Sequence, residues 1–223
     1  MKDRVIGAVT IGQAPRVDIM PELTVILGPE VQVKEAGALD GLSKEEIAAF
    51  APKKGDYVLV TRLADGSSVK VAEQYITPRL KEKITSLFDQ GIEVVALLCT
   101  GEFELVGTGL LVRPQPILYN VTQAVATGLK IGVMSPAADQ IPQSRRRWQQ
   151  VGTEQVVVAA SPYGDVAELE KAADTLRHEH VQLVVLDCMG YTLAMKEKVR
   201  KITGAPVILA RGIFARVLKE LIG

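Results

Sequence analysis

Short, continuously apolar runs recur along the sequence, and they limit its possible folds more than any other feature. Amphipathic stretches separate them, and several runs do not alternate between apolar and polar residues. Strands that are apolar on both faces are typical of parallel sheets covered by helices. The alternation of strands and helices therefore predicts a mostly parallel α/β architecture. The runs are RVIGAVTIG, EVQVKEAGAL, DYVLVTRL, IEVVALLCTG, LKIGVMSP, QVVVAASP, VQLVVLDCMG and PVILARG.

Start signals support several of the intervening helices. Ser43 and Glu46 have the spacing of a capping box, Thr77-Pro78 places proline at a first helical position, and Asp165 can cap the segment after it. We expect helices over residues 43–50, 77–90, 119–126, 143–151, 166–179, 191–201 and 213–222. One segment departs from this order, because VLVTRLADGSSVKV predicts a β-hairpin insertion with its turn at Asp65-Gly66.

A weak internal repeat divides the chain. Residues 4–9 resemble residues 129–134, and residues 94–101 resemble residues 183–190. Each half thus has an opening strand that contains Ile-Gly and a later apolar strand that ends in Cys-x-Gly. The repeat predicts two similar lobes, with parallel sheets flanked by helices and related by a pseudo-two-fold axis. We expect residues 1–112 to form the first lobe, joined by residues 206–223, and residues 113–205 to form the second.

Composition narrows the partners. Lys plus Arg equals Asp plus Glu at 26 each, so no net charge favours nucleic acid or an anionic membrane surface. No apolar stretch approaches the ~20 residues that span a bilayer, and the start of the chain has no cleavage site typical of a signal peptide. We therefore expect a cytoplasmic protein that binds neither nucleic acid nor membrane. Its two cysteines are expected to stay reduced there.

Cys99 and Cys188 are the candidate catalytic residues. Both end matching strands, and ligands of parallel sheets bind at the carboxyl ends of strands. A helix that begins just after each thiol would stabilise a thiolate. Two thiols on opposite faces of one carbon can remove a proton from one face and deliver one to the other, which inverts a stereocentre without a cofactor or metal. The alternatives are that the cysteines are small apolar core residues, or that they form a disulfide.

The motifs around these cysteines resemble the aspartate/glutamate/hydantoin racemase superfamily, and within it the AroM family. The similar segments are TIGQAPR at residues 10–16, LLCTGEF at 97–103, PILYNVTQAVATGLKIGVMSP at 116–136 and LDCMGY at 186–191. The resemblance implies that Cys99 and Cys188 act as a base and acid pair. The implied substrate-binding residues are Thr10, Gly12, Gln13, Arg16, Thr100, Gly101, Ser135, Met189, Gly190 and Tyr191. The Cys-Met-Gly-Tyr motif is nearer to hydantoin racemases than to amino-acid racemases.

Several charged residues have two interpretations. Arg62 and Arg211 lie at or near strand ends, where they would bind a substrate carboxylate or form surface salt bridges. Asp187 would raise the pKa of the neighbouring thiol by charge repulsion or cap a nearby helix. Residues 145–147, an Arg-Arg-Arg run, are expected on an exposed helix face, with Trp148 as a packing residue. His178 and His180 are two residues apart on a predicted helix, so they point to different sides and are not expected to bind one metal ion together.

Two functional hypotheses follow. The first is a cofactor-independent racemase, epimerase or isomerase that acts on a small carboxylate or ring-amide substrate. The second is a non-catalytic sensor or regulator that binds a small molecule in the same pocket. Relatives in the superfamily also suggest a homodimer.

Overall fold

The computed structural model describes residues 4–223, so the first three residues of the predicted first lobe lie outside it. Two compact units make up the chain: Met1–Pro114 with Arg216–Gly223, and Gln115–Ala215. Up to residue 112 the elements are β1 Arg4–Thr10, α1 Met20–Leu27, β2 Val31–Gly37, α2 Lys44–Ala48, β3 Val58–Arg62, β4 Ser68–Ala72, α3 Glu73–Asp89, β5 Val94–Leu97 and β6 Leu110–Val112. The later elements are α4 Pro114–Val125, β7 Ile131–Ser135, η1 Ala138–Gln140, α5 Ile141–Trp148, η2 Gln149–Val151, β8 Gln155–Ala159, α6 Val166–His178, β9 Leu183–Leu186, α7 Leu193–Thr203, β10 Val207–Leu209 and α8 Ala210–Ile222.

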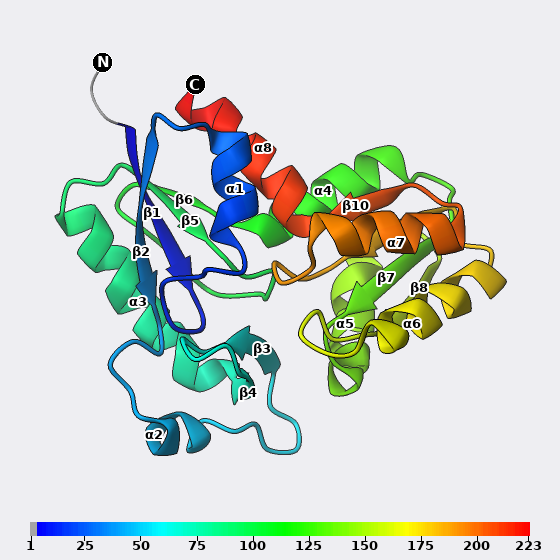
Figure 1. Ribbon diagram of the computed structural model, residues 1–223, viewed down its shortest axis with the longest axis horizontal. Helices are drawn as coiled ribbons and strands as arrows, with labels where there is room; N and C mark the ends of the chain where they lie inside the picture. Colours follow the sequence, from blue (N-terminus) through cyan, green and yellow to red (C-terminus); the bar gives the residue numbers. More distant parts are fainter. Residues whose placement is uncertain (1–3) are drawn as a thin grey trace. The chain divides into compact units, whose positions relative to one another are not determined.

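Each unit contains a parallel sheet flanked by helices (Figure 1). Both sheets have four strands in the same order. The first runs β2-β1-β5-β6, and the second runs β8-β7-β9-β10. The opening strand of each repeat, β1 or β7, is central and pairs on one side with the strand that precedes a cysteine. The predicted α/β class and the two similar lobes are confirmed.

A glycine in each central strand lets a helix pack closely on the sheet. A Cβ at Gly7 would lie 2.9 Å from Leu87 of α3, and one at Gly132 would lie 2.8 Å from Leu176 of α6. Real Cβ atoms do not approach so closely, so the Ile-Gly of the repeat is a helix-packing position in both units. The repeat therefore extends from the sequence to the packing of the core.

The hairpin insertion forms as predicted. Strands β3 and β4 pair antiparallel from Val58 with Ala72 to Arg62 with Ser68. Gly66 has a φ of 86°, a conformation that glycine adopts without strain. Short helix α2 begins with the predicted capping box, in which Ser43 and Glu46 satisfy each other's backbone N–H groups.

Four elements differ from the expectations. Helix α3 begins at Glu73, four residues before the predicted start, and Pro78 lies inside it. Burial explains the earlier start, because Ile76 opens the apolar stripe that continues through Leu80 and Ile84. Helix α4 begins at Pro114, five residues before the predicted start at residue 119. Helix α1 and the three-residue strand β6 carry no strong pattern and were not predicted.

The C-terminal boundary needs a correction. We expected the chain to return to the first lobe at residue 206, but β10 pairs with β9 and completes the sheet of the second unit. The return comes at Arg216, within α8. Each repeat's last helix is thus shared or exchanged, because most of α4 belongs to the second unit and the end of α8 belongs to the first. Lys219, near the end of α8, donates to the carbonyl oxygen of Leu27 and to the carboxylate of Glu30 in the first unit.

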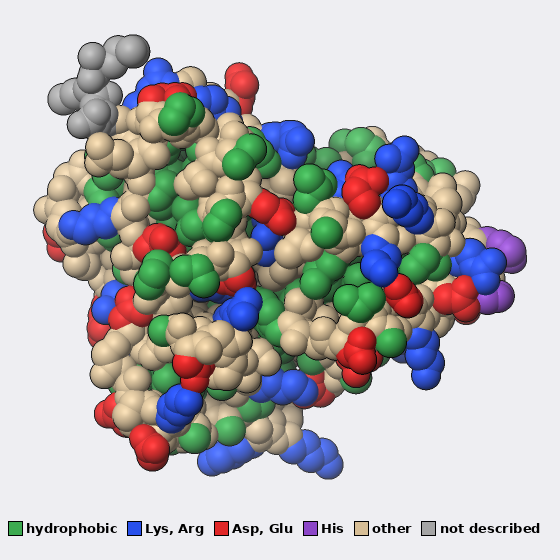
Figure 2. Space-filling model, in the orientation of Figure 1, with side chains coloured by type: hydrophobic (Ala, Val, Ile, Leu, Met, Phe, Trp, Pro, Cys, Tyr) green, Lys and Arg blue, Asp and Glu red, His purple; other side chains and the backbone are tan. Residues whose placement is uncertain are grey.

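The surface carries charges of both signs. On the face drawn in Figure 2, Lys and Arg side chains are interspersed with Asp and Glu. His178 and His180 are exposed, as expected for a solvated helix end. Within residues 4–223, no helix is long and apolar enough to cross a membrane.

Candidate active site

Cys99 lies two residues beyond the end of β5, at the carboxyl end of the first sheet. The N–H of Leu98 donates to the carbonyl oxygen of Val9 at 2.7 Å, which fixes the chain beside the end of β1. The N–H of Gly101 donates to Cys99 Sγ at 3.3 Å. A backbone donor on the sulfur stabilises negative charge there.

Cys188 has the same local structure in the second unit. It lies two residues beyond β9, and the N–H of Asp187 donates to the carbonyl oxygen of Met134 at 3.0 Å. The N–H of Gly190 donates to Cys188 Sγ at 3.3 Å. The matching Cys-x-Gly segments therefore adopt matching hydrogen-bonded turns. Cys188 is 9% exposed, and both cysteines are free thiols rather than a disulfide.

Thr10 and Ser135 are equivalent hydroxyls at the ends of β1 and β7. The carbonyl of Thr10 accepts from Ala38 N–H at 2.9 Å, and that of Ser135 accepts from Ala160 N–H at 3.0 Å. Thr10 Oγ1 accepts from the guanidinium of Arg16 at 2.7 Å. Ser135 Oγ is buried and has no hydrogen-bond partner among the described residues. Ser135 thus offers an unused polar atom at the sheet end that holds Cys188.

Arg16 is held inside the first unit. Its Nε and Nη2 donate to the two carboxylate oxygens of Asp18 at 2.9 and 2.8 Å, and the side chain is 4% exposed. Burial would raise the pKa of Asp18, but the hydrogen bonds and charge of Arg16 outweigh it, so this pKa lies below its usual 3.8. The predicted role of Arg16 in substrate binding stays a prediction, and its observed contacts order the loop after β1.

Gly12 and Gln13 join this loop to the hairpin. A Cβ at Gly12 would lie 2.4 Å from the carbonyl oxygen of Arg62, so only glycine fits. The side chain of Gln13 accepts from Ala64 N–H at 2.9 Å and donates to the carbonyl oxygen of Leu39 at 3.3 Å. The hairpin therefore supports the loop that the sequence analysis assigned to the substrate.

Arg62 ends β3 and closes the hairpin. Its Nε donates to the carbonyl oxygen of Gly66 at 2.9 Å, across the predicted turn. Its positive charge is also one of the causes that lower the pKa of Asp18. The structure thus brings Arg62 to the same loop as Gly12 and Gln13.

Arg211 lies 1% exposed at the start of α8 and holds the segment after Cys188. Its Nε donates to the carbonyl oxygen of Met189 at 2.8 Å, and its Nη2 donates to that of Gly190 at 2.9 Å. The predicted role of Arg211 in binding a substrate carboxylate stays a prediction, and these two bonds go to backbone carbonyls. They order the turn that carries the donor to the thiol.

Asp187 forms a buried contact that the sequence analysis missed. Its Oδ2 accepts from Arg147 Nη2 at 2.7 Å and from Trp148 Nε1 at 2.8 Å. Arg147 is only 9% exposed, so the expected exposure of the whole arginine run is wrong at this position. The available signal was helical spacing, since Arg147 follows Ser144 by three residues on the buried face of α5. The ion pair offsets the negative charge beside Cys188.

The remaining predicted residues follow the cysteines directly in the chain. Thr100 is 6% exposed, and a Cβ at Gly101 would lie 2.9 Å from the ring of Phe103. Met189 is 2% exposed. Tyr191 is fully buried and donates to the carbonyl oxygen of Ala160 at 2.5 Å. Burial, followed by the charges of Cys188 and Asp187, raises the pKa of Tyr191 well above its usual 10.0.

The helix expected after each thiol exists only in the second unit. Helix α7 begins at Leu193 and is capped by Thr192, five and four residues after Cys188. After Cys99 the chain is irregular up to β6. The prediction of a helix just beyond Cys99 is therefore wrong, and the donor at that sulfur is the turn alone.

A family model described as "AroM protein" matches residues 6–222. This chain belongs to the AroM family. That confirms the resemblance noted in the sequence. No curated protein matches the chain.

Solved structures with the same fold belong to the racemase superfamily named above. The chain is similar to the allantoin racemase from Klebsiella pneumoniae, with a TM-score of 0.62, 14% identity, and coverage of 98% of this chain and 87% of that one. It is similar to the aspartate racemase of Picrophilus torridus, with a TM-score of 0.62, 13% identity and coverage of 99% and 94%. It is also similar to the maleate isomerase Iso from Pseudomonas putida S16, with a TM-score of 0.63, 13% identity, and coverage of 98% of this chain and 93% of that one. At these identities the likeness establishes the fold.

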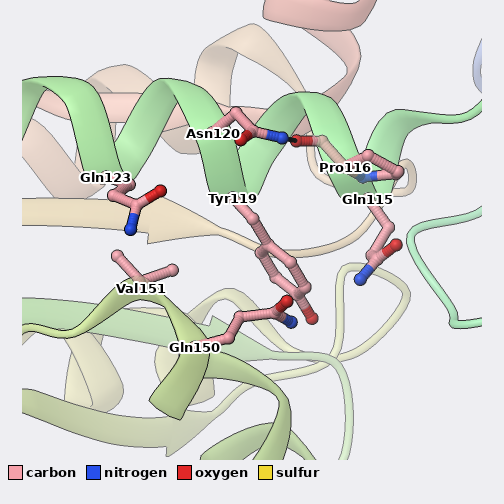
Figure 3. A pocket seen from close by; sticks show the side chains of 7 residues that line it. All are labelled: Gln115, Pro116, Tyr119, Asn120, Gln123, Gln150 and Val151. Atoms are coloured by element: carbon pink, nitrogen blue, oxygen red, sulfur yellow. Dashed lines mark hydrogen bonds between the residues drawn. The ribbon is translucent and has the colours of Figure 1, made fainter.

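Two cavities are lined by none of the predicted site residues. One of about 180 Å³ lies between α4 and η2, where the ring of Tyr119 is surrounded by carboxamides (Figure 3). Another of about 260 Å³ lies between α2 and the hairpin, with Lys44 and Lys70 at its rim. Over the described part of the chain, no group of three or more His, Cys, Asp or Glu side chains is placed to bind a metal ion.

Proposed function

We propose that this AroM-family protein is a cofactor-independent isomerase, of the racemase or epimerase type, that uses Cys99 and Cys188 as an acid and base pair. The supporting observation is the repeated turn in which a glycine N–H donates to the sulfur at 3.3 Å in both units. A cysteine that only fills the core does not need such a donor. Core filling therefore does not explain why both units contain the same hydrogen-bonded turn. The fold shared with racemases and isomerases agrees with this chemistry.

The proposed reaction moves protons only. One sulfur, as the thiolate, takes the proton from a carbon next to a carbonyl group, and the electron pair moves into that carbonyl as an enolate. The other sulfur, as the thiol, delivers its proton to the opposite face of the same carbon. The roles exchange for the other enantiomer, so the pair returns to its starting state after a forward and a reverse turnover.

The hydrogen-bonding groups favour a ring-amide substrate over a dicarboxylate. Arg16 is paired with Asp18, and Arg211 donates to two backbone carbonyls, so part of the hydrogen-bonding capacity of each cation is used internally. Ser135 offers a neutral hydroxyl beside the Cys188 strand. A substrate with a small carboxylate remains the alternative within this proposal. A homodimer and a cytoplasmic location also remain predictions from the sequence.

Deuterium exchange tests the proposal. Hydantoins, amino acids and hydroxy acids, each as single enantiomers, are incubated in D2O with the wild type and with Cys99→Ser, Cys188→Ser and the double variant. We expect the wild type to exchange and racemise one compound class. Each single variant should lose racemisation and keep exchange for only one enantiomer, because one sulfur still reaches one face. Exchange that is unchanged in the double variant would refute the paired-thiol mechanism.

A small-molecule sensor without turnover is the second candidate. The buried hydroxyl of Ser135 supports it, since a bound ligand can supply the missing hydrogen-bond partner without any proton transfer. If a compound raises the melting temperature without exchanging deuterium, the sensor is the better description.

A further inference from the structure

One peptide group connects Arg211 to the sulfur of Cys188. The carbonyl oxygen of Met189 accepts from Arg211 Nε at 2.8 Å. The nitrogen of the same planar amide belongs to Gly190, and its N–H donates to Cys188 Sγ at 3.3 Å. The cation and the sulfur thus bind opposite ends of a single amide dipole.

We propose that Arg211 acts through the Met189–Gly190 peptide to stabilise the thiolate of Cys188, and that Cys188 is therefore the sulfur that carries the negative charge in the substrate-free protein. Arg211 is a positioning residue in this proposal, since it touches the peptide and the peptide touches the thiol. The assignment of Cys188 as the base rests on the proposed function, but the charge on its sulfur does not.

The direction of the dipole carries the argument. A cation at the carbonyl oxygen polarises the amide and makes its N–H a stronger donor, as in any chain of hydrogen bonds. Arg211 is 1% exposed, so solvent screens this effect little. Its second bond, to the carbonyl oxygen of Gly190 at 2.9 Å, fixes the next peptide and prevents the amide from turning away.

Packing holds the same peptide in place from the other side. A Cβ at Gly190 would lie 2.6 Å from Tyr163 Oη and 2.7 Å from Pro162 Cγ. The backbone of Gly190 therefore lies in close contact with the loop before α6. Glycine is required for close approach here, while Arg211 supplies the charge.

Other ionisable groups near Cys188 have their own partners. Asp187 opposes a thiolate, but Arg147 of α5 lies 2.7 Å from its carboxylate. Tyr191 donates to the carbonyl of Ala160, and burial keeps it neutral by raising its pKa. Tyr163, on the loop before α6, is a further cause of that shift.

The first unit provides a natural comparison. Arg113 comes directly after β6, and Arg211 comes two residues after β10. The Nη1 of Arg113 donates to the carbonyl oxygen of Phe103 at 3.4 Å, four residues beyond Cys99. That carbonyl is not part of the Thr100–Gly101 peptide whose N–H reaches Cys99 Sγ. The two arginines thus bind their loops at different points, which makes Arg113 the matched control.

Ionisation of a single thiol tests the inference without substrate. In a Cys99→Ser protein, thiolate absorbance in the ultraviolet is followed against pH, with the Cys99→Ser/Cys188→Ser protein as the blank. Adding Arg211→Met should raise the ionisation midpoint of Cys188 by about one pH unit, and Arg211→Lys should restore part of the shift. Adding Arg113→Met should leave the midpoint within about 0.2 units. An unchanged midpoint in folded Arg211→Met protein overturns the proposal.

A second measurement avoids any change at Arg211, in case its removal prevents folding. In Cys99→Ser protein, nuclear magnetic resonance follows the Gly190 amide and the Arg211 Nε–H against pH. Both signals should move with the midpoint of Cys188, because they lie on one hydrogen-bonded chain. If the Arg211 signal is indifferent to that midpoint, the proposal is wrong. Since no substrate is present, a failure of the deuterium exchange leaves this result standing, and the reverse also holds.

Discussion

Replacing Ser135 by alanine should stabilise the free protein and weaken its function. Ser135 Oγ is buried and has no hydrogen-bond partner among the described residues, and an unsatisfied buried hydroxyl costs about 1–3 kcal/mol. Recovering about 1 kcal/mol should raise the melting temperature by about 2–4 °C in a chain of this length. A substrate that uses the hydroxyl should then lose about fivefold in kcat/KM, which corresponds to one hydrogen bond.

Ser144 provides the matched control in the same unit. It is also fully buried with an unsatisfied hydroxyl, but it lies on α5 and belongs to no predicted site. Ser144→Ala should raise the melting temperature similarly and leave exchange unchanged. Thermal unfolding followed by circular dichroism, and deuterium exchange on the responsive compound, measure the two effects. If Ser135→Ala lowers the melting temperature, or if both variants change exchange equally, the argument for a ligand at this hydroxyl fails.

Three other perturbations follow from the contacts. Gly190→Ala should cost about 1–3 kcal/mol in urea unfolding, because its Cβ would clash with Tyr163; stability equal to wild type would contradict that packing. Asp187→Ala should cost about 3–5 kcal/mol by leaving Arg147 buried without its carboxylate, and adding Arg147→Met should recover part of the loss. Asp18 has a lowered pKa, so its stabilising effect is complete above pH 3.8 and is lost as the pH falls further. The difference in melting temperature between wild type and Asp18→Asn should therefore shrink below that pH, and a constant difference would argue against the pairing.

The sequence predicts the fold well because buried strands and helix faces appear in it as regular patterns of apolar residues. Apolar runs gave both sheets, and the two Ile-Gly and Cys-x-Gly segments gave their equivalence. Short or weakly patterned elements, such as the three-residue strand β6, were not predicted. Pro78 misplaced the start of α3, because local proline preference was weighed above the buried stripe that begins at Ile76.

Contacts between distant side chains were beyond sequence reasoning. Nothing in the order of residues says that Arg211 meets the carbonyls of Met189 and Gly190, or that Arg147 meets Asp187. Strand ends place chemistry-bearing residues at one edge of a sheet, but they do not say which partner each residue takes. The cysteines were found because their type is rare and their positions repeat. The arginines were common enough to allow several roles.

The exchanged ends of the chain have a consequence for any attempt to separate the lobes. A single cut after Pro114 would leave the first unit without Arg216–Gly223, and so without the Lys219 contacts to Leu27 and Glu30. The first fragment is then incomplete, because the second fragment carries the end of its unit, and complementation by co-expressed fragments is the appropriate experiment.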